Sequence, residues 1–320
     1  MILANELKKR YDIHFIINNN KSAIKLLDDK KITHSIIPEH ISIKRTCREI
    51  NQTMKSESNN LLILDFREYA ERISRILRNE NYKIMIIDDA WIQYLYANFL
   101  INGTPVKQYH NYKIVNNSAK IFLGTKYFIM SEEFLKHKKR VSEIREKKQY
   151  RIVISIGGSD THNLTLLILK SLLDLDYLQI IVIVGPFSHN QTKLEKLIKN
   201  NKHIIVLRSP KSIWKEFNKA DLVISSAGST LFELAVQRVP TLCISDSKHQ
   251  IPYARVFSSQ GFSINLGYYH NVNSRTISNS VVRILNDVRK RRRMVLTGNK
   301  IIDGRGLSNI VVIIDKILSR

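Results

Sequence analysis

The chain has 320 residues, of which 43% are hydrophobic and 25% are charged. This composition is ordinary for a globular protein and excludes wholesale disorder, and the length predicts two domains, each with its own core. Lysine and arginine number 51 against 28 aspartates and glutamates, which gives a formal net charge of +23. A charge of this size indicates polyanionic neighbours, such as nucleic acid, an acidic membrane surface or phosphorylated substrates.

Two cysteines, Cys47 and Cys243, lie far apart, and Cys243 falls in a run that predicts a buried strand. This pattern indicates reduced structural thiols and excludes a disulfide framework or a cysteine metal site. No apolar run reaches the roughly 18 residues of a membrane span, and no signal-peptide pattern is present. We therefore expect a cytoplasmic protein that uses neither a metal nor another cofactor.

Residues 1–135 predict helices and strands in alternation, which is typical of a Rossmann-like domain with a parallel sheet. An amphipathic helix is expected to begin at Met1. Because a sheet of this kind normally begins with a strand near its middle, we expect this domain to lack its first strand. The elements expected after the first helix lie at 13–17, 22–28, 35–37, 61–65, 68–78, 83–88, 91–100 (a helix) and 121–134 (a strand and a loop).

Two basic runs interrupt an otherwise even spread of positive charge. Residues 136–150 are expected to form a basic linker, and Arg289 to Arg293 form a tighter cluster near the C-terminus. We interpret both runs as solvated helix faces. No nucleic-acid fold signature accompanies them, so a nucleic-acid partner is not expected. A peripheral contact with an acidic membrane surface stays open as an alternative, and the sequence does not indicate an oligomeric state.

Residues 151–302 predict a second domain of the same kind, opening with a strand at 152–156. A Gly-Gly turn follows this strand, and Thr161 or Asn163 is expected to cap the next helix. Such a junction can cradle a diphosphate, but it is also common as a plain turn. It matches neither G-x-G-x-x-G nor the Walker pattern, which makes a dinucleotide or ATP site improbable. The residues of this junction are Gly157, Gly158, Ser159 and Asp160.

The rest of this domain continues the alternation of strands and helices. Residues 303–320 contain a last helix, at 308–318, that we expect to pack across the domain junction. The elements expected before it lie at 179–184, 191–199, 204–207, 213–218, 222–224, 241–244, 253–260 and 262–266, with a further helix that starts near Ser229 or Thr230 and ends at Val239-Pro240.

A loop of small residues at 225–230 separates a buried strand from an amphipathic helix. Small side chains let the backbone N–H groups of Gly228, Ser229 and Thr230 approach a bound group. The free N–H groups and the positive dipole end of the following helix form a site for an anion. The sequence therefore predicts an anion site at this helix end.

Glu233 has two interpretations. Thr230 and Glu233 have the spacing of a T-x-x-E capping box, in which the two side chains satisfy N–H groups at the helix start. In the other interpretation, the carboxylate accepts both hydroxyls of a ribose whose phosphates rest on the same helix end.

The segments GGSD at 157–160 and SSAGSTLFELAVQRVP at 225–240 resemble the nucleotide-sugar half of GT-B glycosyltransferase-like proteins. This superfamily includes the lipid II N-acetylglucosaminyltransferases. Within it, the sequence is similar to the UDP-sugar hydrolases of pseudaminic acid biosynthesis and to spore-coat polysaccharide proteins of the same type. The resemblance implies an α/β fold of GT-B type, with two Rossmann-like domains and parallel sheets.

The resemblance also implies roles for single residues on the nucleotide side. The Gly-Gly-Ser-Asp and Gly-Ser-Thr loops would hold the diphosphate, and Glu233 would hold the ribose. Gln250 matches the last residue of the Asn-Gln pair of the family, whereas His249 stands in the place of that Asn. An imidazole does not copy the donor and acceptor of an amide, so the sugar is expected to be recognised differently there.

Few of the catalytic residues of the family have a counterpart in this sequence. The hydrolases of this family carry a Gly-His pair after their first strand, and that His is taken to activate water. This sequence begins at what matches the following helix, so the pair is absent from it. Asp88 is a weak candidate for a catalytic group, because Asp88-Asp89-Ala90 stands where the family usually has Asp-x-Tyr.

The lead hypothesis is a hydrolase that releases UDP and a free deoxyamino sugar for a nonulosonic acid or a surface polysaccharide. One alternative is a GT-B glycosyltransferase, in which a sugar or lipid acceptor replaces water. Another is a nucleotide-sugar-binding paralogue without turnover. Two explanations for the missing Gly-His pair are open. Either the true start of the protein lies further upstream, or the protein is a relative that binds a nucleotide sugar without hydrolysing it.

Overall fold

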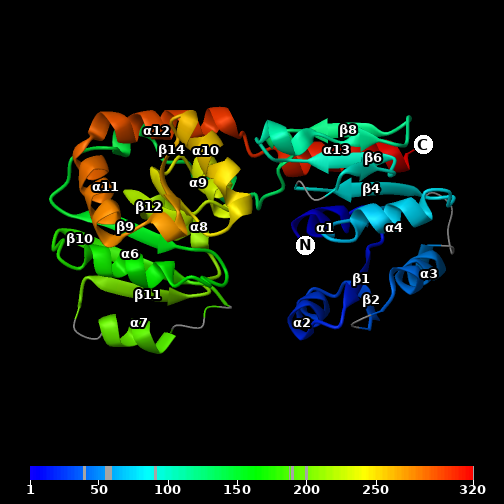
Figure 1. Cartoon of the computed structure of the whole chain (residues 1–320), viewed down its shortest axis with the longest axis horizontal. Coiled ribbons are helices and arrows are strands. Elements are labelled where there is room, and N and C mark those ends of the chain that lie inside the picture. Colours follow the sequence, from blue (N-terminus) through cyan, green and yellow to red (C-terminus); the bar gives the residue numbers. More distant parts are fainter. Residues whose placement is uncertain are drawn as a thin grey trace. The chain divides into compact units, whose positions relative to one another are not determined.

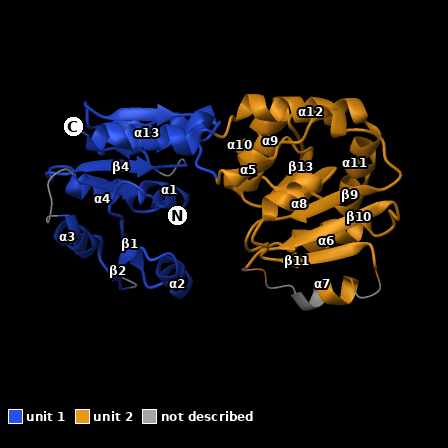
Figure 2. Ribbon diagram, turned by 180° about the vertical axis from the view of Figure 1, so that it is seen from behind, with its two compact units in different colours: residues 1–130, 305–320 blue, residues 131–304 orange. Residues whose placement is uncertain are grey.

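The computed structural model of the protein describes residues 1–38, 41–54, 60–89, 92–186, 188, 191–198 and 201–319. The chain forms two compact units, unit 1 (residues 1–130 and 305–320) and unit 2 (residues 131–304), which are coloured separately in Figure 2. Each unit combines helices with parallel strand pairs (Figure 1). The α/β class and the parallel pairing predicted from the sequence are confirmed.

Unit 2 is built on one six-stranded parallel sheet with the order β11-β10-β9-β12-β13-β14. The strands are β9 (Tyr150–Ser155), β10 (Leu178–Val184), β11 (Ile204–Arg208), β12 (Leu222–Ser226), β13 (Thr241–Ser245) and β14 (Ser263–Tyr268). The helices are α5 (Glu133–Lys136), α6 (Leu164–Leu172), α7 (Gln191–Ile198), α8 (Ile213–Lys219), α9 (Ser229–Gln237), α10 (Ile251–Ser259), α11 (Ser274–Asn286) and α12 (Val288–Ile301), with 3-10 turns η3 (Val141–Glu143), η4 (Lys248–Gln250) and η5 (Tyr269–Asn271).

The strand order of unit 2 reverses between β9 and β12. From β9 the chain runs outward through β10 to β11, and it then returns to place β12 beside β9 and runs outward the other way. At such a point the loops at the carboxyl ends of the two central strands diverge, and they leave a crevice in which ligands bind. The topology therefore marks the ends of β9 and β12 as the place to examine for a site.

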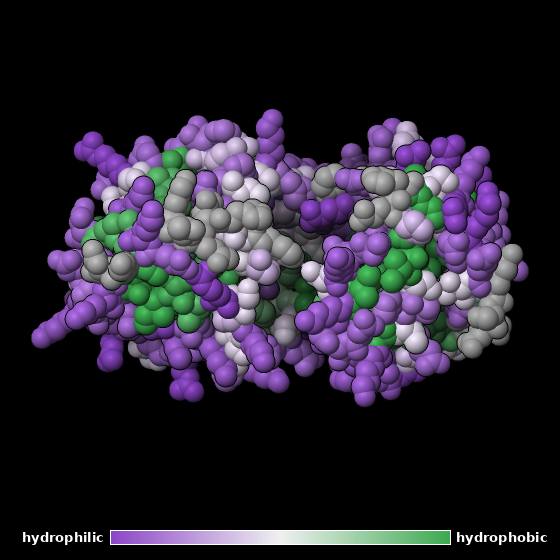
Figure 3. Space-filling model, turned by 90° about the horizontal axis from the view of Figure 1, so that it is seen from below, coloured by the Kyte–Doolittle hydropathy of each residue, from purple (hydrophilic) through white to green (hydrophobic). Residues whose placement is uncertain are grey.

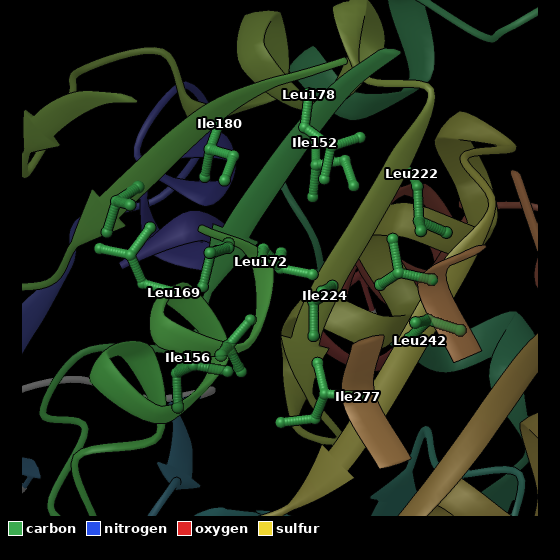
Figure 4. Packing of buried hydrophobic residues seen from close by; sticks show 14 of the residues in the cluster. Ile152, Ile156, Leu169, Leu172, Leu178, Ile180, Leu222, Ile224, Leu242 and Ile277 are labelled. Atoms are coloured by element: carbon green, nitrogen blue, oxygen red, sulfur yellow. The ribbon is translucent and has the colours of Figure 1, made fainter. Parts of the chain in front are cut away.

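The core of unit 2 explains why its central strands consist of apolar runs. Helices cover both faces of the sheet, so every side chain of these strands must be buried. Ile152, Val153 and Ile154 of β9 are all fully buried. Figure 4 shows Ile152 of β9 and Leu222 and Ile224 of β12 in one cluster with Leu169 and Leu172 of α6, Leu242 of β13 and Ile277 of α11.

Unit 1 contains a four-stranded parallel sheet with the order β3-β4-β6-β8, and separate parallel pairs β1-β2 and β5-β7. The strands are β1 (His14–Asn18), β2 (Thr33–Ile37), β3 (Leu61–Leu64), β4 (Lys83–Ile87), β5 (Tyr94–Leu95), β6 (Phe99–Asn102), β7 (Lys113–Ile114) and β8 (Lys120–Leu123). The helices are α1 (Ile2–Leu7), α2 (Lys21–Asp29), α3 (Ile43–Met54), α4 (Ala70–Leu77) and α13 (Gly306–Leu318), with 3-10 turns η1 (Lys107–His110) and η2 (Thr125–Tyr127).

The C-terminal helix α13 belongs to unit 1. Its apolar face, which includes Ile310 and Ile314, is buried in one cluster with Leu3 and Leu7 of α1 and Met85 of β4. We expected this helix to pack across the domain junction, and the cluster that it joins lies within unit 1.

The prediction of a helix at 91–100 is wrong. Residues 94–95 form β5 and residues 99–102 form β6, which lies between β4 and β8 in the sheet. Leu100 and Ile101 are almost fully buried there, because both faces of a parallel strand are covered. A short apolar run of this kind cannot be told from a helix by its periodicity, and the aromatic and β-branched residues were the better indicator. Trp91 lies outside the described residues.

The interpretation of the two basic runs as solvated helix faces is wrong at two positions. Lys139 is 4% exposed and Arg291 is fully buried. The Arg291 guanidinium lies over the Tyr150 ring, 5.2 Å from its centroid, and donates to the carbonyl oxygen of Leu285 at 2.9 Å. Burial lowers the pKa of the Lys139 ammonium. Residues 136–150 are counted within unit 2, and Lys139 among them is buried in it.

The surface of each unit is mostly hydrophilic on the side drawn in Figure 3, with smaller hydrophobic areas between charged side chains. Among the described residues, no helix is both long enough and apolar enough to cross a membrane.

The contact between α12 and α9 gives a first prediction. A Cβ atom on Gly298 would overlap the carbonyl oxygen of Ala235 and would lie 3.0 Å from the Phe262 ring. Gly298→Ala should therefore lower the free energy of unfolding by about 2 kcal/mol, even though alanine favours helices. Urea unfolding measures the change. Thr297→Ala on the same helix should stay within about 0.5 kcal/mol of the parent, and equal stability of the two variants would contradict the close packing.

Candidate functional site

The candidate site lies at the carboxyl ends of β9, β12 and β13, where three loops converge. The hydroxyl oxygen of Ser226 lies 3.7 Å from where a Cβ on Gly157 would stand and 3.8 Å from the corresponding position on Gly228. Gly157 has a φ of +81°, which favours glycine. The structure therefore brings together two glycine loops that are far apart in the sequence, as the reversal of strand order requires.

Helix α9 begins at this site with an open N-terminus. Gly228 is its N-cap residue, and no side chain caps the helix. Leu231 donates its N–H to the carbonyl oxygen of Gly228, whereas no acceptor is recorded for the N–H groups of Ser229 and Thr230 among the described residues. Free N–H groups at the positive end of a helix dipole attract an anion.

The capping box expected between Thr230 and Glu233 is not formed. The helix starts one residue before Thr230, so the two side chains do not have the positions that a capping box needs. Glu233 lies half-buried on the second turn, and in the described part of the chain no hydrogen bond or ion pair is recorded for its carboxylate. Burial raises the pKa of Glu233 to about 7. A desolvated carboxylate without a donor is costly, and a ligand hydroxyl would supply the missing donor.

Gln250 ties the loop after β12 to the loop after β13. Its side-chain oxygen accepts the N–H of Ala227 at 3.1 Å and the N–H of Asp246 at 3.2 Å. Its side-chain nitrogen lies 3.4 Å from where a Cβ on Gly228 would stand. Gln250 therefore shapes the backbone of the site, and its amide N–H₂ group faces the open end of α9.

His249 packs beside this loop. Its Nε2 atom lies 3.2 Å from the hydroxyl oxygen of Tyr253, and the two rings meet edge to face. Tyr253 contacts Phe232 of α9 in the same way. The imidazole is therefore oriented by its neighbours, on the side of the site that the sequence assigned to sugar recognition.

Asp160 caps the helix that follows its own loop. Its carboxylate accepts the N–H groups of Leu164 at 2.8 Å and Thr165 at 3.1 Å, so it closes the N-terminus of α6. Thr161 and Asn163 do not cap this helix, because Asn163 occupies the N-cap position without a side-chain bond. A negative side chain thus occupies the N-terminus of α6, which leaves α9 as the open helix end of the two.

The structure adds residues that the sequence analysis did not single out. A Cβ on Gly185, directly after β10, would overlap the carbonyl oxygens of Gly157 and Gly158, so the Gly-Gly turn rests on this glycine. His162 stacks on Tyr269 with ring centroids 3.7 Å apart. The sequence could have indicated Gly185, because a glycine at the carboxyl end of a buried strand is a usable signal. It could not have indicated the stacking of His162 on Tyr269, because a single sequence does not show which loops lie side by side.

Asp88 of unit 1 already has donors. Its carboxylate accepts the hydroxyl of Tyr112 at 2.8 Å and the N–H of Ile92 at 3.3 Å, and Asn102 donates to the Tyr112 hydroxyl oxygen at 2.6 Å. Burial and the nearby charge of Asp88 raise the pKa of Tyr112. These bonds indicate that Asp88 anchors the loops at the carboxyl edge of the unit 1 sheet. No cluster of three or more potential metal ligands occurs among the described residues of the chain.

Comparison with known proteins shows what the chain is similar to. Residues 151–295 match the glycosyltransferase family 28 C-terminal domain. The chain is 24% identical over 317 residues to the spore coat polysaccharide biosynthesis protein SpsG of Bacillus subtilis, covering 98% of this chain and 91% of that protein. It is 28% identical over 223 residues to the UDP-2,4-diacetamido-2,4,6-trideoxy-beta-L-altropyranose hydrolase of Campylobacter jejuni, covering 69% of this chain and 78% of the hydrolase.

Among solved structures, the protein is similar to MurG of Acinetobacter baumannii. The TM-score is 0.73 at 14% sequence identity, and the match covers 98% of this chain and 94% of that structure. At this level of identity the similarity concerns the fold. The fold is GT-B-like, with two Rossmann-like domains, as the sequence predicts.

The raised pKa of Glu233 predicts a change of stability with pH. The folded protein holds this proton up to about pH 7, whereas the ordinary value for the carboxyl is 4.5. Ionisation therefore destabilises the fold as the pH rises through this window, by at most about 3 kcal/mol above pH 7. Glu233→Gln should raise the free energy of unfolding by about 1–3 kcal/mol at pH 8 and by little at pH 5.

Urea unfolding at both pH values measures this difference. Glu146→Gln is the matched control, because Glu146 is exposed and lies in the same unit. It should change stability equally at pH 5 and pH 8. A Glu233→Gln variant that is no more stable than the parent at pH 8 would show that the carboxylate is not desolvated.

Proposed function

We propose that unit 2 binds a UDP-sugar and that the protein hydrolyses it to UDP and a free sugar. The observation that carries the proposal is Glu233, a desolvated carboxylate on the second turn of the helix with the open N-terminus, for which the described residues supply no recorded donor. A stability role does not account for it, because the capping box is not formed and the charge is costly in the folded protein.

The diphosphate would rest on the N-terminus of α9. The N–H groups of Ser229 and Thr230 are available as donors, and Gly228 leaves room for the phosphate oxygens to reach them. The helix dipole adds attraction for the negative charge. The amide nitrogen of Gln250 and the turn of Gly157 and Gly158 border the same space, so a diphosphate would meet donors from two loops.

The ribose would lie one helical turn further along α9. A carboxylate can accept two hydroxyl donors at once, which suits the vicinal 2′- and 3′-hydroxyls of a ribose. The ionised carboxylate is the better acceptor. Binding should therefore lower the pKa of Glu233 and offset the cost of its desolvation.

In the hydrolytic step, a water oxygen forms a bond to the anomeric carbon. The bond from that carbon to the phosphate oxygen breaks, its electron pair leaves with UDP, and the water gives up a proton. The N–H groups at the start of α9 would stabilise the negative charge on the departing diphosphate. Asp88 stays a weak candidate for the base, since Tyr112 and Ile92 already donate to it.

The name of one relative supports hydrolysis and a deoxyamino sugar, and the name of another supports a role in polysaccharide biosynthesis. One is named as the hydrolase of a UDP-linked diacetamido-trideoxy sugar, and the other as a protein of spore coat polysaccharide biosynthesis. By analogy, we propose a deoxyamino sugar as the product, destined for a nonulosonic acid of the pseudaminic type or for a surface polysaccharide.

Sugar transfer is the second candidate, and a separate observation favours it. Residues 151–295, which contain the candidate site, match the C-terminal domain of a glycosyltransferase family. In a transferase the hydroxyl of an acceptor would replace water, while the contacts to UDP stayed the same. The two functions therefore differ in what attacks the anomeric carbon.

Binding of UDP provides the first test. The parent should bind UDP, and Glu233→Ala should weaken binding by about 1–3 kcal/mol, because the ribose hydroxyls lose a buried acceptor. UDP binding should also strengthen between pH 6 and pH 8 in the parent, as Glu233 ionises, more than it does in Glu233→Gln. Calorimetric titration measures both effects.

The control for this titration is Glu146→Gln, which removes one exposed carboxylate from the same unit. It should bind UDP as the parent does. A folded parent that does not bind UDP, or a Glu233→Ala variant that binds it equally well, would contradict the assignment of the site.

Release of UDP from a UDP-linked N-acetylated amino sugar separates the two reactions. Hydrolysis predicts steady release in the absence of any acceptor, lowered about 5- to 160-fold in Glu233→Ala at subsaturating substrate, in keeping with a lost contact of about 1–3 kcal/mol. Release that occurs only with an added acceptor would establish transfer instead. Binding of UDP without any turnover would identify a nucleotide-sugar-binding paralogue.

A further inference from the structure

Helix α12 is held firmly by one of its faces. Met294, Val295 and Gly298 on this face are buried, and Gly298 allows the close approach to α9 described above. In Figures 1 and 2, α12 runs along the outer border of unit 2. Its opposite face must therefore point to solvent.

The opposite face of α12 carries a stripe of cations around one apolar side chain. The spacing of three, four, seven and eleven residues from Arg289 places the stripe on one side of the helix. Leu296 is 55% exposed, more than any other large hydrophobic residue among those described. The exposed residues of the stripe are Arg289, Arg292, Arg293, Leu296 and Lys300.

The segment before β9 extends this stripe. Arg292 donates to the carbonyl oxygen of Ile144 at 3.1 Å, and Arg291 donates to the carbonyl oxygen of Arg145 at 3.3 Å. These bonds hold the backbone of residues 144 and 145 against α12, and Arg145 and, three residues later, Lys148 are exposed. We call the stripe together with these two residues the α12 basic surface.

The cations of the α12 basic surface have few acidic neighbours. In the described part of the chain, no ion pair is recorded for any of the six. Of the acidic residues in the same stretches, Glu143 accepts the N–H of Arg140, Asp287 accepts the N–H of Lys290, and Glu146 is exposed. Because the inner face of α12 is packed, the helix cannot turn to separate its charges. Like charges held together in this way repel, and an anionic partner would relieve the repulsion.

We propose that the α12 basic surface binds the surface of an anionic phospholipid bilayer. Each cation near such a surface is attracted by its negative potential, and an apolar side chain among the cations can enter the boundary between headgroups and acyl chains. Nucleic acid is the competing polyanion. The surface has no aromatic side chain on which an unpaired base could stack, and Leu296 has no role in a contact with phosphates. These features favour the lipid surface.

Co-sedimentation with vesicles tests the proposal. The probe is vesicles of equal parts phosphatidylglycerol and phosphatidylcholine at about 0.15 M salt, with phosphatidylcholine vesicles as the neutral control. The parent should bind the anionic vesicles and not the neutral ones. The double variant Arg292→Gln, Arg293→Gln should bind about 30-fold more weakly, since each cation contributes about 1 kcal/mol and 1.4 kcal/mol is tenfold.

The matched control removes two exposed cations elsewhere in unit 2. Lys170 in α6 and Lys202 before β11 are both exposed, so Lys170→Gln, Lys202→Gln changes the net charge equally. It should keep nearly full binding to the anionic vesicles. Equal loss in the two double variants would show a general effect of charge and overturn the assignment to α12. Urea unfolding shows that each variant is folded.

Two further measurements distinguish a lipid surface from nucleic acid as the partner. Leu296→Ser, which changes no charge, should weaken vesicle binding several-fold, and an unchanged affinity would overturn the choice of a lipid surface. Titration of the parent with single-stranded and double-stranded RNA at the same salt should give weaker binding than the vesicles. Tighter binding of RNA that is lost in the Arg292, Arg293 double variant would replace the membrane by nucleic acid. None of these results depends on the nucleotide site.

Discussion

The candidate site depends on the contrast between two helix N-termini at the carboxyl edge of one parallel sheet. Asp160 closes the N-terminus of α6 with its own carboxylate, whereas α9 begins at Gly228 with no side-chain cap. The reversal of strand order between β9 and β12 brings the two loops together. Because α9 alone of this pair is open, an anion has one favourable place to bind, and Glu233 lies one turn beyond it.

This arrangement lowers stability where it supports binding. Burial makes ionisation of the Glu233 carboxyl costly, and the glycines at 157, 185 and 228 keep side chains away from the site at a cost in chain entropy. Gln250 compensates in part, because its side-chain oxygen accepts the backbone N–H groups of Ala227 and Asp246 and so joins two loops of the site. Residues that lower the stability of the fold and make no stabilising contact in it are expected at functional sites.

Local signals predicted the fold and led to the candidate site, and they failed where contacts join residues that are far apart in the sequence. Apolar runs such as 152–156 identified the buried strands, and the small residues at 225–230 identified the open helix end. The run at 91–100 was misassigned because a short buried strand and a helix share its pattern. The capping box at Glu233 depended on the exact start of α9, which a sequence does not fix within a residue or two. The burial of Arg291 depends on the Tyr150 ring, which lies far from it in the chain.

Proton release on binding of UDP tests the central claim most directly. If the Glu233 carboxylate accepts the ribose, binding near pH 7 must expel the proton that burial retains, about half a proton per UDP. Calorimetry in two buffers of different ionisation enthalpy measures this number. We expect the release in the parent to exceed that in Glu233→Gln by this amount. Equal release in both proteins would show that Glu233 does not receive the nucleotide.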